Sequence, residues 1–565
     1  MTKNFKSLYM SPIKTICITF LITVAFNFIV FTSCSQNSEK SKPVIVVGVS
    51  SDVATINPLY AFDLQEGHLV DLLFLKPALE IWNDSLGIIE FSPLLAESWQ
   101  FSKDSNSITV NLRNNIYWSD GKPITTDDVI FSFDVYSDPK VNSRLFGMFN
   151  NFYQDKEFHI EIDKTFRKNS DKSLTIFFKD YKSFTLLDIN HAILPEHVYK
   201  GIKREDIETA ELNFNPVTSG PFKLYKWDRD QKIHLRADSS CFLFNSKNVQ
   251  EIILKIIPDE YSRITQLKKG EIDLIEDVSS EKVQELTPDE NIIIGSIKGR
   301  DYDYVGWNHI DPISYSQKQN RPNKFFSSAK TRKALSLAIN RNEIFQSIVG
   351  KYGVIYDSPI SPIFKQYFDS SLIKTEYNPS LAKKILAEEG WKDNNGDGVL
   401  EKNNQKFSFK IYTAAGNSIR QYIGTIVKNN LKEVGIETEL MFIEKNELVD
   451  GMIGRKYDAW ISGWSIEIPL KLDTYWSSDP EKIMLNFSNF SNQELEKIFN
   501  DIKPADSEEK KISNYKRVSE IFKEYEPVTM LFWTNNIIGY NKRIKNIKFS
   551  PLGLFSNAWD WRIEN

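Results

Sequence analysis

The sequence predicts an α/β protein with more than one domain, and three observations support this. The run VIVVGVSS (Val44–Ser51) is continuously apolar, as in a strand that is buried on both faces of a parallel sheet. The run SITVNLR (Ser107–Arg113) alternates apolar and polar side chains, which is typical of a half-buried antiparallel strand. The chain has 565 residues, which is too long for one compact core and indicates two or three domains.

The N-terminus carries the pattern of a secretory signal. Lysines precede the apolar run Ile16–Phe31, and no acidic residue occurs before Glu39. This run is shorter than the roughly 20 residues that cross a bilayer, although a plain transmembrane anchor is the alternative. The run leads into FTSC, and a small residue directly before Cys34 resembles a bacterial lipobox. We therefore expect a signal peptide over residues 1–33, a lipid on Cys34 and a polar, flexible tether over residues 34–42.

Four later stretches have the apolar spacing of amphipathic helices. The first has Thr125 or Thr126 as its N-cap, and the acidic residues that follow favour the positive end of the helix dipole. Gly350 provides a C-terminal stop for the second stretch. The predicted helices lie within Ile124–Asp138, Ser328–Gly350, Asn378–Trp391 and Ile419–Ile436.

Composition excludes several classes of function. The net charge is −5, and it becomes −8 without the three lysines of the signal, so no basic surface for nucleic acid is expected. The six histidines are scattered, and the sequence has no HExxH, no GxSxG and no Gly-rich phosphate loop. We therefore expect no catalytic residues and no cofactor. Aromatic residues make up 13% of the chain, with 12 Trp, which suits stacking pockets.

One segment permits an alternative interpretation as a calcium loop. In DNNGDGVLEKNN, the side chains of Asp393, Asn395 and Asp397 match the first half of an EF-hand loop. The twelfth position is Asn404, where such a loop requires a bidentate Glu. A tight turn is therefore the favoured prediction, and a structural Ca²⁺ with Glu401 as an added ligand is the alternative. No other metal site is predicted.

Several stretches together resemble one family. The segment from Pro93 to Phe133, PLLAESWQFSKDSNSITVNLRNNIYWSDGKPITTDDVIFSF, is similar to the signature of the family 5 solute-binding proteins. These are the dipeptide- and oligopeptide-binding components of ABC importers. Further similar segments follow in the family's order, namely ILPEHVY, TSGPFKLYKW, LKKGEIDLI, TRKALSLAINRNEI, AKKILAEEGWKDNNGDG and EPVTMLFWTNNIIGY.

This resemblance implies a type II periplasmic binding protein fold, with two lobes and an inserted extra domain. Two chain crossings, near Lys298–Asp303 and Tyr525–Leu531, would form a hinge, and the ligand would bind in the cleft between the lobes. The implied boundaries are residues 43–82, 191–297 and 526–565 for lobe I, 83–190 for the inserted domain II, and 298–525 for lobe III.

The resemblance also implies ligand-binding residues. The segment Ser462–Glu467, SGWSIE, would border the ligand, and the Glu467 carboxylate would bind a peptide's α-ammonium through charge-assisted hydrogen bonds. Peptide-binding relatives carry Asp at this position, which is shorter by one methylene. The other implied lining residues are Trp464 and Ser465 beside it, Asp52 and Val53 from lobe I, and Tyr304, Trp307 and Asn308 from the first crossing.

The predicted function is that of an extracytoplasmic lipoprotein that captures short peptides and delivers them to an ABC permease. The permease and ATPase subunits would be separate chains, and the protein would be a monomer held at the cell envelope by its lipid, facing the periplasm or the outside. One alternative keeps the binding role for another solute, such as an oligosaccharide or a nickel chelate, since one fold hosts several ligands. A second alternative is a receptor module that presents bound ligand to a signalling partner.

Overall fold

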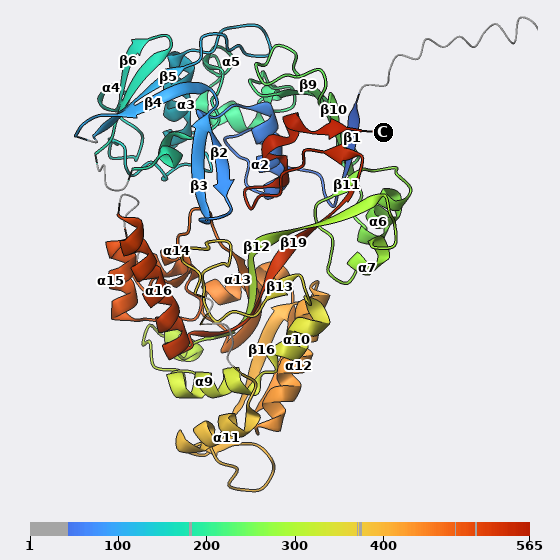
Figure 1. The fold of residues 1–565 in the computed structure, drawn as a ribbon. Coiled ribbons are helices and arrows are strands. Elements are labelled where there is room, and N and C mark those ends of the chain that lie inside the picture. The colour runs from blue at the N-terminus through green and yellow to red at the C-terminus, as the bar shows by residue number, and fades with distance from the viewer. Residues whose placement is uncertain are drawn as a thin grey trace, which may run out of the picture.

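One sheet of 11 strands runs through most of the molecule (Figure 1). The computed structural model describes residues 43–104, 106–179, 184–369, 371, 376–480, 482–502 and 506–564. The predicted signal peptide, Cys34 and the tether lie outside the described residues. In order across the sheet, the strands are β17 (Glu437–Ile443), β16 (Ser408–Ala414), β18 (Ala459–Ser465), β12 (Ile292–Trp307), β19 (Val528–Asn541), β11 (Leu274–Ile275), β1 (Val44–Val49), β10 (Glu251–Ile256), β9 (Lys232–Ala237) and β8 (Phe222–Asp228), with β13 (Gly353–Val354) also pairing with β19.

Strand β1 confirms the prediction made from its apolar run. It pairs in parallel with β10 on one side and with β11 on the other, and Ile45 and Val47 are fully buried. The sheet as a whole is mixed, because β9, β12 and β19 pair with antiparallel neighbours. The predicted α/β class with parallel strands and antiparallel hairpins is therefore confirmed.

Strands β12 and β19 are the long strands that join the two halves of this sheet. From Ile292 to Lys298, β12 pairs with the end of β19, whereas from Asp301 onward it also pairs with β18. The register shifts between Lys298 and Asp301, opposite Thr534 and Asn535 of β19. Both strands thus cross between the halves at one level (Figure 1). The first crossing coincides with the predicted hinge segment.

The second crossing lies later in the chain than the predicted segment Tyr525–Leu531. The first half of β19, including Leu531 and Trp533, packs in two clusters of buried side chains. The helices of these clusters, such as α12 and α16, belong to the lower part of the molecule in Figure 1. We therefore propose that lobe III extends to Thr534 and that the return to lobe I begins at Asn535, rather than at Glu526.

A separate four-stranded sheet and a hairpin lie between β1, the first strand of lobe I, and the point where the chain returns to lobe I. The sheet has the order β4 (Ala96–Phe101), β5 (Ser107–Leu112), β7 (Ser173–Phe177) and β6 (Phe166–Ser170), and the hairpin is β2 (Ala78–Asn83) with β3 (Ile88–Pro93). Helix α3 (Thr126–Ser137) begins at the N-cap Thr125, one of the two predicted candidates, which forms a capping box with Asp128. One continuous cluster of buried side chains joins α3 to β1, so domain II packs directly on lobe I.

The helices of lobe III cover both faces of its part of the sheet. The prediction of one helix across Ser328–Gly350 is wrong, because α9 (Ala329–Ala338) ends before Asn340, whose side chain caps the start of α10 (Arg341–Ile348). The other two predicted helices are confirmed. They are α11 (Pro379–Glu388) and α12 (Ser418–Glu433), and they are followed by α13 (Lys445–Ile453), α14 (Asp473–Trp476), α15 (Gln493–Asp501) and α16 (Glu508–Tyr525).

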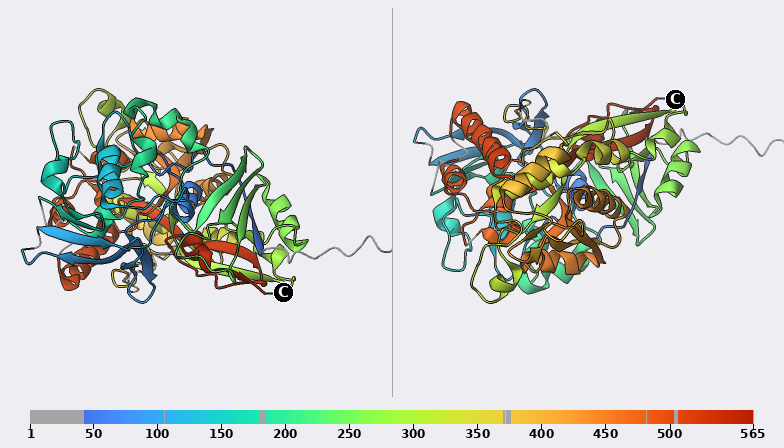
Figure 2. Two further views of the ribbon diagram at one scale, coloured as in Figure 1. Left: turned by 90° about the horizontal axis from the view of Figure 1, so that it is seen from above. Right: turned by 90° about the horizontal axis from the view of Figure 1, so that it is seen from below.

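Shorter elements complete the fold. No helix in the described part of the chain is long and apolar enough to span a membrane. Strand β1 and the C-terminal end lie at the same end of the molecule (Figures 1 and 2). The remaining helices and strands are α2 (Leu64–Leu73), α4 (Ile162–Thr165), α5 (Glu196–Tyr199), α6 (Glu260–Lys268), α7 (Val283–Leu286), α8 (Pro312–Ser316), β14 (Glu401–Lys402), β15 (Gln405–Lys406), β20 (Ile544–Lys545) and β21 (Arg562–Ile563).

Candidate functional site

The end of β18 is held from both sides. The backbone carbonyl of Arg300 accepts a hydrogen bond from the Ile466 N–H at 2.9 Å. The side-chain Nη1 of Arg300 donates to the Ile466 carbonyl at 3.0 Å. The Oη of Tyr475 donates to the carbonyl of Ser465 at 3.1 Å. Since Ile466 is also fully buried, the backbone that carries Glu467 is fixed by hydrogen bonds and by packing.

The Glu467 side chain is exposed at this fixed position. None of the described residues forms a hydrogen bond or a salt bridge with its carboxylate. Burial, with a contribution from the Glu467 charge, raises the pKa of Tyr475 to about 12, so the phenol remains a hydrogen-bond donor at neutral pH. The carboxylate can therefore accept a cation without losing a contact within the protein.

The side chain of Trp464 lies in an aromatic group next to Glu467. Its ring centroid is 4.8 Å from that of Tyr475 and 5.1 Å from that of Phe487, the latter in a stacked arrangement. Trp464 is half-buried and Ser465 is exposed. Part of the indole thus remains accessible, which is compatible with the predicted contact to a ligand.

The residues directly after Glu467 line a cavity of about 980 Å³. It lies between the β2–β3 hairpin, at whose first strand the predicted boundary of lobe I and domain II falls, and the helices of lobe III. This volume is in the range of ligand pockets. Most of the lining side chains are apolar. The apolar lining residues are Trp82, Ile88, Ile89, Phe91, Leu187, Phe364, Ile468, Pro469, Leu470, Leu472, Met484, Leu485, Phe499 and Ile502.

The charged side chains of this cavity are largely paired. The Glu508 carboxylate accepts hydrogen bonds from Tyr367 Oη at 3.1 Å and from Lys511 Nζ at 3.0 Å. Lys482 Nζ lies 3.2 Å from Asp473 Oδ2. A ligand that enters the cavity would thus meet apolar surface, neutralised pairs and Lys471, which has no salt bridge with a described residue. Glu467 presents an unpaired carboxylate beside the cavity.

Domain II contacts lobe III at the tip of the β2–β3 hairpin. Lys365 Nζ lies 2.7 Å from Asp84 Oδ2, and the Gln366 N–H donates to the Leu86 carbonyl at 3.4 Å. Gly87 has φ +73°, and a Cβ there would lie 2.3 Å from the Ile363 carbonyl oxygen. Only glycine allows this close approach. The hairpin therefore closes one side of the cavity.

The predicted residues of β12, and Asn308 directly after it, are buried in lobe III. Tyr304 is 2% exposed, and its Oη accepts a hydrogen bond from Trp460 Nε1 at 3.3 Å. Trp307 is 0% exposed and donates to Thr529 Oγ1 at 3.0 Å. Asn308 is also 0% exposed, and its amide donates to the Tyr457 carbonyl. In this structure Trp307 and Asn308 are core residues, and their predicted contact with ligand gains no support.

The two predicted residues of lobe I are likewise engaged within the protein. The side chain of Asp52 is 7% exposed. Its carboxylate accepts hydrogen bonds from Trp227 Nε1 at 3.0 Å and from the N–H groups of Val53 and Asp230 at 2.9 Å. Val53 is buried in the shared core of lobe I and domain II. These contacts fasten the loop after β1 to the β8–β9 hairpin and do not bring Asp52 to Glu467.

The segment suggested as a calcium loop forms a hydrogen-bonded turn. Asp393 accepts the N–H groups of Gly396 and Gly398 at 2.7 and 3.0 Å, and both glycines have positive φ. Asp397 pairs with Lys406, and Glu401 accepts from Asn395 Nδ2 at 2.7 Å. Among the described residues no group of three or more His, Cys, Asp or Glu side chains is placed to hold a metal. The favoured turn accounts for these contacts.

Sequence reasoning did not find the cavity. Its walls come from the β2–β3 hairpin and from α15 and α16, which lie several hundred residues apart in the chain. The hairpin carries apolar side chains such as Trp82 and Phe91, but nothing in the sequence pairs them with a particular segment of lobe III.

Comparisons with known proteins agree with this architecture. The sequence model of the bacterial extracellular solute-binding proteins, family 5, matches residues 90–482. The oligopeptide-binding protein AppA of Bacillus subtilis is 29% identical over 526 residues, which cover 92% of this chain and 91% of AppA. The dipeptide-binding protein of Escherichia coli is 21% identical and covers 83% of this chain and 85% of its own length. These relatives are solute-binding proteins, which supports a binding role over an enzymatic one.

Solved structures with the same fold carry different ligands. The structure of Bacillus subtilis AppA in complex with a nonapeptide has a TM-score of 0.71 and 28% identity, over 93% of this chain and all of that one. NikZ from Campylobacter jejuni in complex with Ni(L-His) has a TM-score of 0.72 at 22% identity, over 92% of this chain and 99% of that one, and shows the fold alone. Because the family match spans well over half of the chain, the protein belongs to the bacterial extracellular solute-binding proteins of family 5.

Proposed function

We propose that this protein captures short peptides and delivers them to the permease of an ABC importer. The observation that carries the proposal is the exposed, unpaired carboxylate of Glu467 on a fixed backbone, in a chain that is similar to AppA over almost its whole length. A free α-ammonium is the group that this carboxylate would bind, through charge-assisted hydrogen bonds. Glu467 is the residue we assign to the peptide's N-terminus.

The rest of the peptide would lie along the segment that follows Glu467. Ile468, Pro469 and Leu470 line the apolar cavity, so side chains of a bound peptide would enter it. Half-buried Trp464 would add aromatic surface beside the ammonium. Rotation of the lobes about β12 and β19 would close the protein on its ligand, in the manner of hinged binding proteins.

The predicted lipid on Cys34 remains part of this proposal. A lipidated chain would work at the outer face of a membrane, with separate permease and ATPase subunits that receive the peptide. Labelling of cells with a fatty-acid probe would test it, since the label should enter the wild-type chain and be absent from Cys34→Ala. A label in both chains would contradict lipidation at Cys34.

A metal or other chelate is the second candidate ligand. The fold neighbour NikZ was solved with Ni(L-His), and the aromatic group of Trp464, Tyr475 and Phe487 offers stacking surface for a planar ligand. A chelate of this kind would not need a free ammonium to reach Glu467. N-acetylation of the ligand therefore separates the two candidates.

Titration of the intrinsic tryptophan fluorescence tests the proposal directly. The ligands are a pool of short peptides with free amino termini, the same pool after N-acetylation, an oligosaccharide mixture and Ni(L-His). The proposal predicts a saturable change and a higher melting temperature with the free-amino pool, and weaker binding of the same pool after N-acetylation. If no peptide changes either signal while the sugar or the chelate does, the peptide assignment is wrong.

A further inference from the structure

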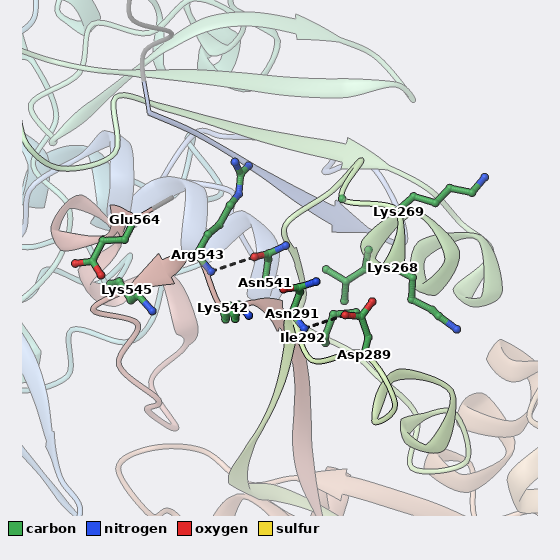
Figure 3. A pocket seen from close by; sticks show the side chains of 12 residues that line it. Lys268, Lys269, Asp289, Asn291, Ile292, Asn541, Lys542, Arg543, Lys545 and Glu564 are labelled. Carbon is green, nitrogen blue, oxygen red and sulfur yellow. Dashed lines mark hydrogen bonds between the residues drawn. The ribbon is translucent and has the colours of Figure 1, made fainter.

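A group of lysines gathers at one edge of lobe I, away from the cavity. Lys268 and Lys269 lie at the C-terminal end of α6, and Lys542 and Lys545 follow the end of β19 (Figure 3). All four line one surface pocket of about 510 Å³. We call them the cationic edge.

The charges of the cationic edge are not neutralised within the protein. None of the four lysines has a salt bridge with another described residue. Arg543, which also lines the pocket, is paired with Asp273 at 2.7 Å. The lining carboxylates are those of Asp289, which accepts the Asn291 N–H at 2.9 Å, and Glu564 (Figure 3). The edge is thus locally positive on a protein whose net charge is negative.

Topology places the cationic edge at the end of the sheet where the described chain begins. Strand β1 runs parallel to β11, and the Asp273 N–H donates to the Val46 carbonyl at 2.7 Å. The Asn541 N–H donates in turn to the Asp273 carbonyl at 2.8 Å. The residues before Val46, those before Asp273 and those after Asn541 therefore all extend beyond the same end of the sheet. Pro43 and the cationic edge share that end.

A lipid on Cys34 would keep this end of the sheet close to a membrane, because the tether is short. The nine residues from 34 to 42 can span at most about 30 Å when fully extended. A lipid on Cys34 would hold Pro43 within that distance of the bilayer. Each Lys near an anionic lipid surface contributes about 1 kcal/mol of attraction, and this attraction fades beyond a Debye length of about 10 Å.

We propose that the cationic edge is a docking surface for anionic phospholipid headgroups, which orients lobe I toward the membrane. The physiological role rests on the proposed lipid anchoring, but the docking itself does not require the lipid. An overall negative protein is repelled by an anionic bilayer, and a positive edge beside the tether offsets that repulsion where the two surfaces meet.

Sedimentation with vesicles tests the proposal on the mature chain from residue 34, with Cys34→Ser so that no lipid is attached. We expect binding to vesicles that contain phosphatidylglycerol, little binding to pure phosphatidylcholine, and weaker binding as salt is raised. Each lysine changed to Gln should weaken binding about fivefold, so the quadruple change at Lys268, Lys269, Lys542 and Lys545 should reduce it to background.

A matched variant and a second readout keep the test specific. The control variant carries Gln in place of four exposed lysines of lobe III that have no salt bridge with a described residue, namely Lys383, Lys384, Lys428 and Lys432. This variant should bind vesicles as the parent does. Melting temperature and peptide titration of both variants should match the parent, so a failure of peptide binding is distinguishable from a failure of docking. Equal binding to both lipids, or no loss in the quadruple variant, overturns the proposal. The proposal is also wrong if the quadruple variant loses peptide uptake in cells although the parent chain binds no vesicles. That result would indicate a protein partner for the cationic edge.

Discussion

The sequence predicts ligand contact for two carboxylates, those of Asp52 and Glu467, but the two lie in different environments. Asp52 follows β1 and Glu467 follows β18, and both strands belong to the one large sheet. Asp52 is buried and accepts hydrogen bonds from three N–H groups, whereas Glu467 is exposed and has no hydrogen-bond partner among the described residues.

The difference lies in donors that come from elsewhere in the chain. Trp227 and Asp230 reach Asp52 from the β8–β9 hairpin, about 175 residues away. Among the described residues, no donor from another part of the chain reaches the Glu467 carboxylate. The Asp52 carboxylate therefore stabilises the fold, whereas the Glu467 carboxylate is accessible to the ligand that we propose it binds.

Loss of the Asp52 carboxylate should produce the largest change in stability. Asp52→Ala leaves the part-buried donors of Trp227 and Val53 without their acceptor, and also removes the bond from the exposed Asp230 N–H. We therefore expect a loss of about 3 kcal/mol in the free energy of unfolding. Denaturant unfolding measures it, with Glu467→Ala as the matched control. The control should change stability by less than about 0.5 kcal/mol, because surface substitutions rarely do more. Equal effects of the two substitutions would contradict the comparison.

Removal of one donor should give about half of that effect. Trp227→Phe keeps most of the ring and deletes the Nε1–H that binds Asp52. A hydrogen bond to a charged group contributes about 1.5–3 kcal/mol, and we expect a loss near the lower value because Arg229 lies 3.7 Å from the same carboxylate. Combination with Asp52→Ala should then be less than additive. Full additivity in denaturant unfolding would show that the two side chains act separately.

Shortening the carboxylate at the other site should affect binding alone. Glu467→Asp moves the charge by one methylene and gives the residue type that the family resemblance implies for peptide-binding relatives. We expect a change of about 1 kcal/mol in peptide affinity, of either sign, because the hydrogen-bond geometry changes while the charge remains. Calorimetric titration measures it. A change in the free energy of unfolding of similar size would assign Glu467 to the scaffold.

The smallest effect is expected at the contact between domain II and lobe III. Asp84→Asn removes the salt bridge to Lys365, and Asp84 is 79% exposed. Exposed pairs contribute at most about 1 kcal/mol, so affinity and stability should change by less than this. Titration at two salt concentrations checks the assignment, since added salt should reduce the difference between wild type and variant. A tenfold loss of affinity would show that hairpin closure, rather than Glu467, controls binding.

Local signals in the sequence predicted much of the fold. The apolar run of β1 and the Thr125 cap of α3 depend on neighbouring residues alone, and both are confirmed. The break between α9 and α10 is also encoded locally, because Asn340 is a good N-cap within the run whose spacing predicts one helix.

The candidate site was less predictable, for two physical reasons. Tyr304 and Trp307 are three residues apart on β12, and an odd separation on a strand points side chains to opposite faces. They lie in different core clusters, so they were poor candidates for one cleft. The cavity was not predictable because contacts such as Lys365 with Asp84 join residues 281 positions apart. Such contacts depend on the packing of whole domains.

Calorimetric titration of wild type and Glu467→Gln, each with one peptide in its free-amino and N-acetylated forms, tests the central claim most directly. The claim predicts that Glu467→Gln weakens the free-amino peptide by about 1.5–3 kcal/mol, the contribution of a hydrogen bond to a charged group. Acetylation should weaken binding to wild type by a similar amount and have little further effect on the variant. Equal affinity of wild type and Glu467→Gln for the free-amino peptide would contradict the claim.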